Sequence, residues 1–74
     1  MAELNVHSDI AASIWQVLVE PDSQVGEGDE VMILESMKME VPVTAPRAGR
    51  VLQVLVVAGQ SVEEGELLIR LDIS

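Results

Sequence analysis

The chain has 74 residues, which suffices for one small domain and is too short for two separate hydrophobic cores. Its 49% hydrophobic content excludes intrinsic disorder, and its net charge of −9 makes nucleic acids and anionic membrane surfaces poor partners. The absence of cysteine excludes disulfides and thiolate chemistry. We expect a single domain over residues 1–74. The sequence has no export signal and no membrane-spanning stretch, so a cytoplasmic location is expected, and the acidic charge favours a monomer.

The pattern of β-branched residues predicts short strands and no helix. Val and Ile together occupy 17 positions, and Gly or Pro interrupts the chain about every ten residues. Two of the predicted strands are apolar on both faces, which favours central positions, and Pro42 favours an edge strand. In chain order the predicted strands are Leu4–His7, Ser13–Val19, Val31–Glu35, Met39–Thr44, Gly49–Val57 and Leu67–Asp72, and the two central ones are Ser13–Val19 and Gly49–Val57.

The chain contains an internal repeat. Residues 3–36 align with residues 40–73 without a gap, and eleven of the 34 aligned positions are identical. Roughly three identities would be expected by chance. Each unit has the pattern strand, turn, strand, and cannot bury an apolar face alone. Two units packed about an approximate two-fold axis would form a flattened sandwich or barrel, so the repeat predicts an all-β fold. The midpoint between the two units falls at Met37.

The midpoint of the repeat contains the only lysine of the chain, Lys38. It lies between two predicted strands, in a tight hairpin that lacks the Asn-Gly or Asp-Gly usual in such turns, which suggests a role besides turning. A deprotonated lysine amine can be acylated, whereas a guanidinium stays protonated. A lone lysine is more often just a solvated charge, and methionines such as Met37 and Met39 more often fill core gaps. Residue chemistry alone leaves both interpretations open.

The run Ser36-Met37-Lys38-Met39, together with residues 43–51 that follow it, resembles the attachment signature of the biotinyl/lipoyl domain family. The resemblance covers almost the whole chain. It implies two four-stranded antiparallel sheets in a flattened barrel with quasi-two-fold symmetry. Relatives that carry lipoate usually have Asp-Lys-Ala at the signature, so the methionines favour biotin. The implied cofactor site consists of Lys38, as the residue of covalent attachment, with its neighbours Glu35, Ser36, Met37 and Met39.

The same resemblance implies a non-catalytic carrier. A biotin protein ligase would adenylate biotin and attach it to Lys38, and the carrier would then move carboxyl groups between biotin carboxylase and carboxyltransferase components. Two alternatives stay open: a lipoate carrier, and an unmodified protein-interaction domain. The gapless repeat leaves no room between Val19 and Val31 for the protruding thumb of the bacterial acetyl-CoA carboxylase carrier. Carriers of pyruvate and other acyl-CoA carboxylases are therefore the closer resemblance.

Other candidate sites are weaker. The run His7-Ser8-Asp9 holds the sole histidine, but a nucleophilic triad needs groups that converge from separated segments, so no catalytic site is expected. Ala12 stands where the family usually has glycine, and it would cost about 1 kcal/mol if that position required positive φ. No metal site is expected, because the acidic turn residues lack calcium-loop spacing; these residues are Glu27, Asp29, Glu30, Glu63, Glu64 and Glu66.

Overall fold

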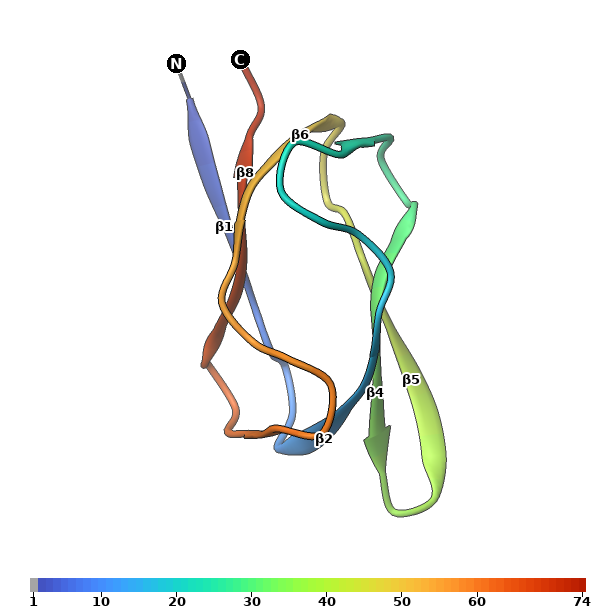
Figure 1. The fold of residues 1–74 in the computed structure, drawn as a ribbon. Helices are drawn as coiled ribbons and strands as arrows, with labels where there is room; N and C mark the ends of the chain where they lie inside the picture. Colours follow the sequence, from blue (N-terminus) through green and yellow to red (C-terminus); the bar gives the residue numbers. More distant parts are fainter. Residues whose placement is uncertain (1) are drawn as a thin grey trace.

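The structure, a computed structural model, describes residues 2–74 as eight strands in two four-stranded antiparallel sheets (Figure 1). The sheet with strand order β5-β4-β2-β7 is called the lysine-bearing sheet, and the sheet with order β1-β8-β6-β3, which holds both termini, the terminal sheet. No helix able to cross a membrane occurs within residues 2–74. The strands are β1 Glu3–His7, β2 Ala12–Val17, β3 Gln24–Val25, β4 Glu30–Ser36, β5 Met39–Thr44, β6 Gly49–Val54, β7 Ser61–Val62 and β8 Leu67–Asp72.

The predicted all-β architecture is confirmed, with two differences in detail. The strands β2 and β6 occupy inner positions and β5 an edge, as their apolar patterns and Pro42 indicated. However, β2 ends at Val17 and β6 at Val54, earlier than predicted, because the chain then crosses from one sheet to the other. The crossings lead into β3 and β7, two-residue strands that the sequence did not reveal.

The two repeat units interlock, since each contributes two strands to each sheet. Hydrogen bonds recur at equivalent places in the two units. Asp22 N donates to Val51 O at 2.8 Å, and the equivalent Gly59 N donates to Ile14 O at 2.7 Å. The approximate two-fold symmetry inferred from the sequence therefore extends to the backbone.

The core between the sheets is aliphatic, and most of its large side chains form equivalent pairs. Burial of each such side chain contributes roughly 1.5–3 kcal/mol to the stability of the fold. Because Trp15 lies half-exposed on the outside, the buried residues include no aromatic side chain. The fully buried pairs are Ile14 and Val51, Val31 and Leu68, Met32 and Ile69, and Leu34 and Leu71.

The equivalent positions 12 and 49 show why one unit holds alanine and the other glycine. Ala12 is not among the residues with positive φ in the described chain, so the strain considered for it does not arise. Gly49 is required for a different reason: a Cβ there would collide with the backbone carbonyl of Asp72 in β8. Close packing of strands, and not left-handed backbone, therefore selects the glycine.

Candidate functional site

The predicted tight hairpin joins β4 to β5 at the end of the molecule opposite both termini (Figure 1). Ser36 pairs with Met39, and only Met37 and Lys38 lie between them. Their φ angles are 52° and 67°, both in the left-handed region. A two-residue loop with positive φ at both positions is the pattern of a type I′ turn, whose twist matches that of the strands it joins.

This turn is strained because neither central residue is glycine. A residue with a side chain pays roughly 1–2 kcal/mol in the left-handed conformation. Of the other described residues with positive φ, three are glycines and only Asp22 has a side chain. Adjacent positive-φ residues with long side chains thus occur here alone within residues 2–74. The strain supports the interpretation that Met37 and Lys38 serve a purpose other than turning.

The side chains of the turn face solvent. Met37 is 92% exposed and Met39 67% exposed, and Lys38 is exposed as well. By contrast Met32, on the strand β4 that leads into the turn, is completely buried. The interpretation of Met37 and Met39 as core-filling residues is therefore wrong. They present flexible apolar surface on either side of the lysine.

The charges around Lys38 are acidic. Glu35 and Glu40, both exposed, pair across β4 and β5 immediately below the turn. None of the ion pairs found in residues 2–74 involves Lys38. Its amine is unhindered, and after losing a proton it can attack an activated carboxylic acid. The hairpin brings the five predicted site residues together at one end of the molecule.

The run around the sole histidine forms no nucleophilic site. Ser8 is only 2% exposed, and its hydroxyl donates a hydrogen bond to Ile10 O at 2.6 Å. Within residues 2–74 no cluster of His, Asp and Glu could hold a metal ion. Two of the acidic turn residues have a structural role that the sequence analysis missed: Asp29 Oδ2 accepts from Gly26 N at 2.7 Å, and Glu66 Oε1 accepts from Glu63 N at 3.0 Å.

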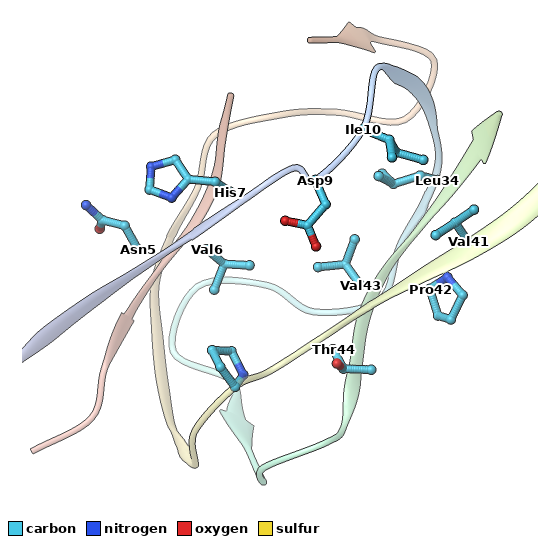
Figure 2. A pocket seen from close by; sticks show the side chains of 11 residues that line it. Asn5, Val6, His7, Asp9, Ile10, Leu34, Val41, Pro42, Val43 and Thr44 are labelled. Atoms are coloured by element: carbon cyan, nitrogen blue, oxygen red, sulfur yellow. The ribbon is translucent and has the colours of Figure 1, made fainter. Parts of the chain in front are cut away.

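A cleft of about 340 Å³ lies between β1 and β5, the facing edge strands of the two sheets (Figure 2). Val6, Asp9 and Val43 gather at its centre, while Asn5 and His7 lie at its margin. Lys38 does not line it. This cleft could not be predicted from the sequence, because local residue patterns do not indicate which two strand edges will face each other.

The terminal sheet carries ion pairs on its outer face. Arg70 donates to both carboxylate oxygens of Glu3, at 2.7 and 2.8 Å, and these hydrogen bonds lower the pKa of Glu3 and raise that of Arg70. Hydrogen bonds from the Ser74 hydroxyl and amide, aided by the charge of Arg50, lower the pKa of Asp72. Arg50 and Arg70 thus both lie on the terminal sheet, which does not bear Lys38.

Comparisons with known proteins agree with this geometry. The family model described as "Biotin-requiring enzyme" matches residues 5–71. A biotinylated protein TB7.3 homolog of Mycobacterium leprae is 46% identical over 68 residues, which cover 92% of this chain and 94% of that protein. A biotin/lipoyl attachment protein of Bacillus subtilis is 43% identical over 68 residues, covering 92% and 93%.

Among solved structures, a single-chain, multi-domain long-chain acyl-CoA carboxylase superposes with a TM-score of 0.92 at 29% identity. The match covers 97% of this chain but only 7% of that carboxylase. The chain belongs to the biotin/lipoyl attachment family and has the fold of its carrier domains. The family resemblance seen in the sequence is confirmed.

Proposed function

We propose that the chain is a carrier to which biotin is joined through an amide bond at Lys38 Nζ. The observation that carries the proposal is the strained, solvent-exposed turn that presents the only lysine of the chain between two exposed methionines. A partner can reach this amine from most directions. Membership of the family and similarity to a biotinylated protein support biotin as the acid.

Attachment needs a separate ligase, because nothing beside Lys38 in the hairpin can activate a carboxylic acid. In this proposal the neutral amine of Lys38 attacks the acyl carbon of adenylated biotin. The C–N bond forms, the bond to AMP breaks, and the surplus proton of the amine passes to the ligase. Bound biotin would supply a group that accepts and releases carboxyl groups.

The chain's own contribution after attachment is positional. The cofactor would hang from a short hairpin at the end of a rigid sandwich, which gives it a high effective concentration at nearby active sites. We propose that these belong to the carboxylase and carboxyltransferase components of a biotin-dependent carboxylase, as the similarity to a multi-domain carboxylase supports. The carrier delivers the group and catalyses no step.

Intact-mass spectrometry tests the proposal. The protein is incubated with a biotin protein ligase, biotin, ATP and Mg²⁺, and in parallel with a lipoate ligase and lipoate. We expect one biotinyl increment on the wild type and none on K38R, which keeps the positive charge and the turn. A biotinyl increment on K38R would show the attachment site to be wrong, and a wild type that receives neither biotin nor lipoate would overturn the carrier function. Lipoylation without biotinylation would identify the chain as a lipoate carrier.

A further inference from the structure

The cleft between β1 and β5 has two unlike walls, although the repeat makes these two edge strands equivalent. The wall that begins with β1 carries polar side chains at alternate positions, while the equivalent positions of the wall that begins with β5 hold two prolines and one threonine. One wall therefore offers polar groups, and the other is mainly apolar. The repeat-equivalent pairs are Asn5 and Pro42, His7 and Thr44, and Asp9 and Pro46.

Asp9 supplies the polar group at the centre of the cleft. Its carboxylate points towards the side chains of Val6 and Val43 (Figure 2). Asp9 is exposed to solvent, and none of the side-chain hydrogen bonds or ion pairs found in residues 2–74 involves it. An ionised carboxylate only accepts hydrogen bonds, so this group is available to an N–H or O–H donor of a ligand.

The near end of the cleft lies within reach of a group attached to Lys38. The strand pair Leu34–Val41, which lines the cleft, is two residues from the pair that closes the hairpin, or about 7 Å at the usual strand rise. A biotinyl group on a lysine places its bicyclic ring at the end of about eleven single bonds, which span roughly 13 Å when extended. The ring can therefore reach the cleft by folding back along β5.

We propose that this cleft is the docking site for the ring system of the biotin carried on Lys38, an inference that rests on the proposed function. One edge of the ring system is a urea with two N–H donors and a carbonyl acceptor, and the opposite edge is a thioether. The urea would donate to the Asp9 carboxylate, and the thioether edge would lie against Val43 and the proline-bearing wall. The ring of lipoate has no N–H donor, so the same cleft favours biotin.

A shallow, solvent-exposed cleft is sufficient because the ligand is tethered. The cleft of about 340 Å³ is at the small end of the range for small-molecule sites, roughly 300–1,000 Å³. A short flexible tether gives its ligand an effective concentration in the millimolar range, so a dissociation constant of about 1 mM keeps roughly half of the rings docked. The ring would be sheltered between transfers, and the weak contact would release it readily to a partner's active site.

Nuclear magnetic resonance tests the docking in the biotinylated protein. Amide spectra of the isotope-labelled carrier are recorded before and after enzymatic biotinylation. Signals of residues 35–40 should move in any case, because the new amide bond forms beside them. We expect signals of residues 5–10 to move as well. These residues lie on and just after β1, which belongs to the other sheet, so a change there reports the ring and not the hairpin.

Two variants and a matched control locate the site. D9A removes the central carboxylate, and T44W fills the cleft from an exposed position of β5. E20A also removes an exposed carboxylate, but Glu20 does not line the cleft. Biotinylation of D9A or T44W should leave the signals of residues 5–10 where they are in the unmodified variant. E20A should behave as the wild type.

Capture by streptavidin gives a second measurement. Because a docked ring must leave the cleft before capture, D9A and T44W should be captured about twofold faster than the wild type, and E20A at the wild-type rate. Wild-type spectral changes confined to residues 35–40, or equal capture rates for all four proteins, would overturn the docking site while leaving attachment at Lys38 intact. A wild type that accepts no biotin would instead overturn the proposed function. Thermal melts establish that each variant is folded, and if neither D9A nor T44W folds, the wild-type spectra decide alone.

Discussion

The two ends of the molecule are equivalent in the repeat but differ in how they close. At the terminal end, the start of β1 and the end of β8 lie side by side without a connection, and Ile73 N donates to Ala2 O at 2.9 Å. At the hairpin end the equivalent strands β5 and β4 are joined through Met37 and Lys38 in a costly backbone conformation. Because the rest of the backbone is shared, features present at both ends serve folding. Features found at the hairpin end alone serve the lysine.

The core is where the two units should be energetically alike. Leu34 and Leu71 are equivalent and both buried, at 1% and 0% exposure. Truncation of either, as L34A or L71A, is expected to lower the free energy of unfolding by about 3–4 kcal/mol, since each leaves a cavity in the same aliphatic core. Urea denaturation measures both. Stability losses that differ by more than about 1 kcal/mol would show that the two units share a backbone structure but contribute unequally to stability.

Positions 12 and 49 are where the units should differ. G49A forces a Cβ against the carbonyl of Asp72, so it should cost about 2–3 kcal/mol as the strands move apart. The reciprocal change A12G should cost only about 0.5–1 kcal/mol, through added freedom of the unfolded chain. Thermal denaturation of the pair distinguishes the cases. A cost for A12G equal to that of G49A would refute close strand packing as the reason for the glycine.

The strain of the hairpin can be removed at the expense of its lysine. The double variant M37N/K38G supplies the Asn-Gly pair that type I′ turns prefer, and it should raise the free energy of unfolding by about 1–2 kcal/mol. It should also accept no biotin. Chemical denaturation tests the first expectation and intact mass the second. Unchanged or lower stability would mean that the turn tolerates Met37 and Lys38 without cost.

The smallest expected effect concerns the ion pairs of the terminal sheet. The pKa values of Glu3 and Asp72 are lower in the folded protein than their ordinary values, so both carboxylates stabilise the fold above the pKa of the unfolded chain. This contribution is lost as the pH falls through the folded pKa. The thermal midpoint should therefore decline below about pH 4, and E3Q should show a shallower decline. An E3Q profile parallel to that of wild type would exclude the Glu3–Arg70 pair as a contributor.

Much of this organisation could be predicted from the sequence because it depends on local patterns. Apolar runs located the six longer strands, and the repeat indicated both the two-fold symmetry and, at its midpoint, the hairpin. The strands β3 and β7 were missed because two residues are too few to show alternation. The cleft and the exposure of Trp15 depend on facing edges and a bulge, which arise only when the sheets assemble.

The position of the chain ends has a practical consequence. β1 begins and β8 ends at the pole remote from Lys38, along a body whose longest dimension is 36 Å (Figure 1). Attachment of a host protein, a flexible linker or a solid support at either terminus would thus leave the reactive lysine pointing outwards. Such an arrangement suits a module that can be spliced into larger assemblies without redesign.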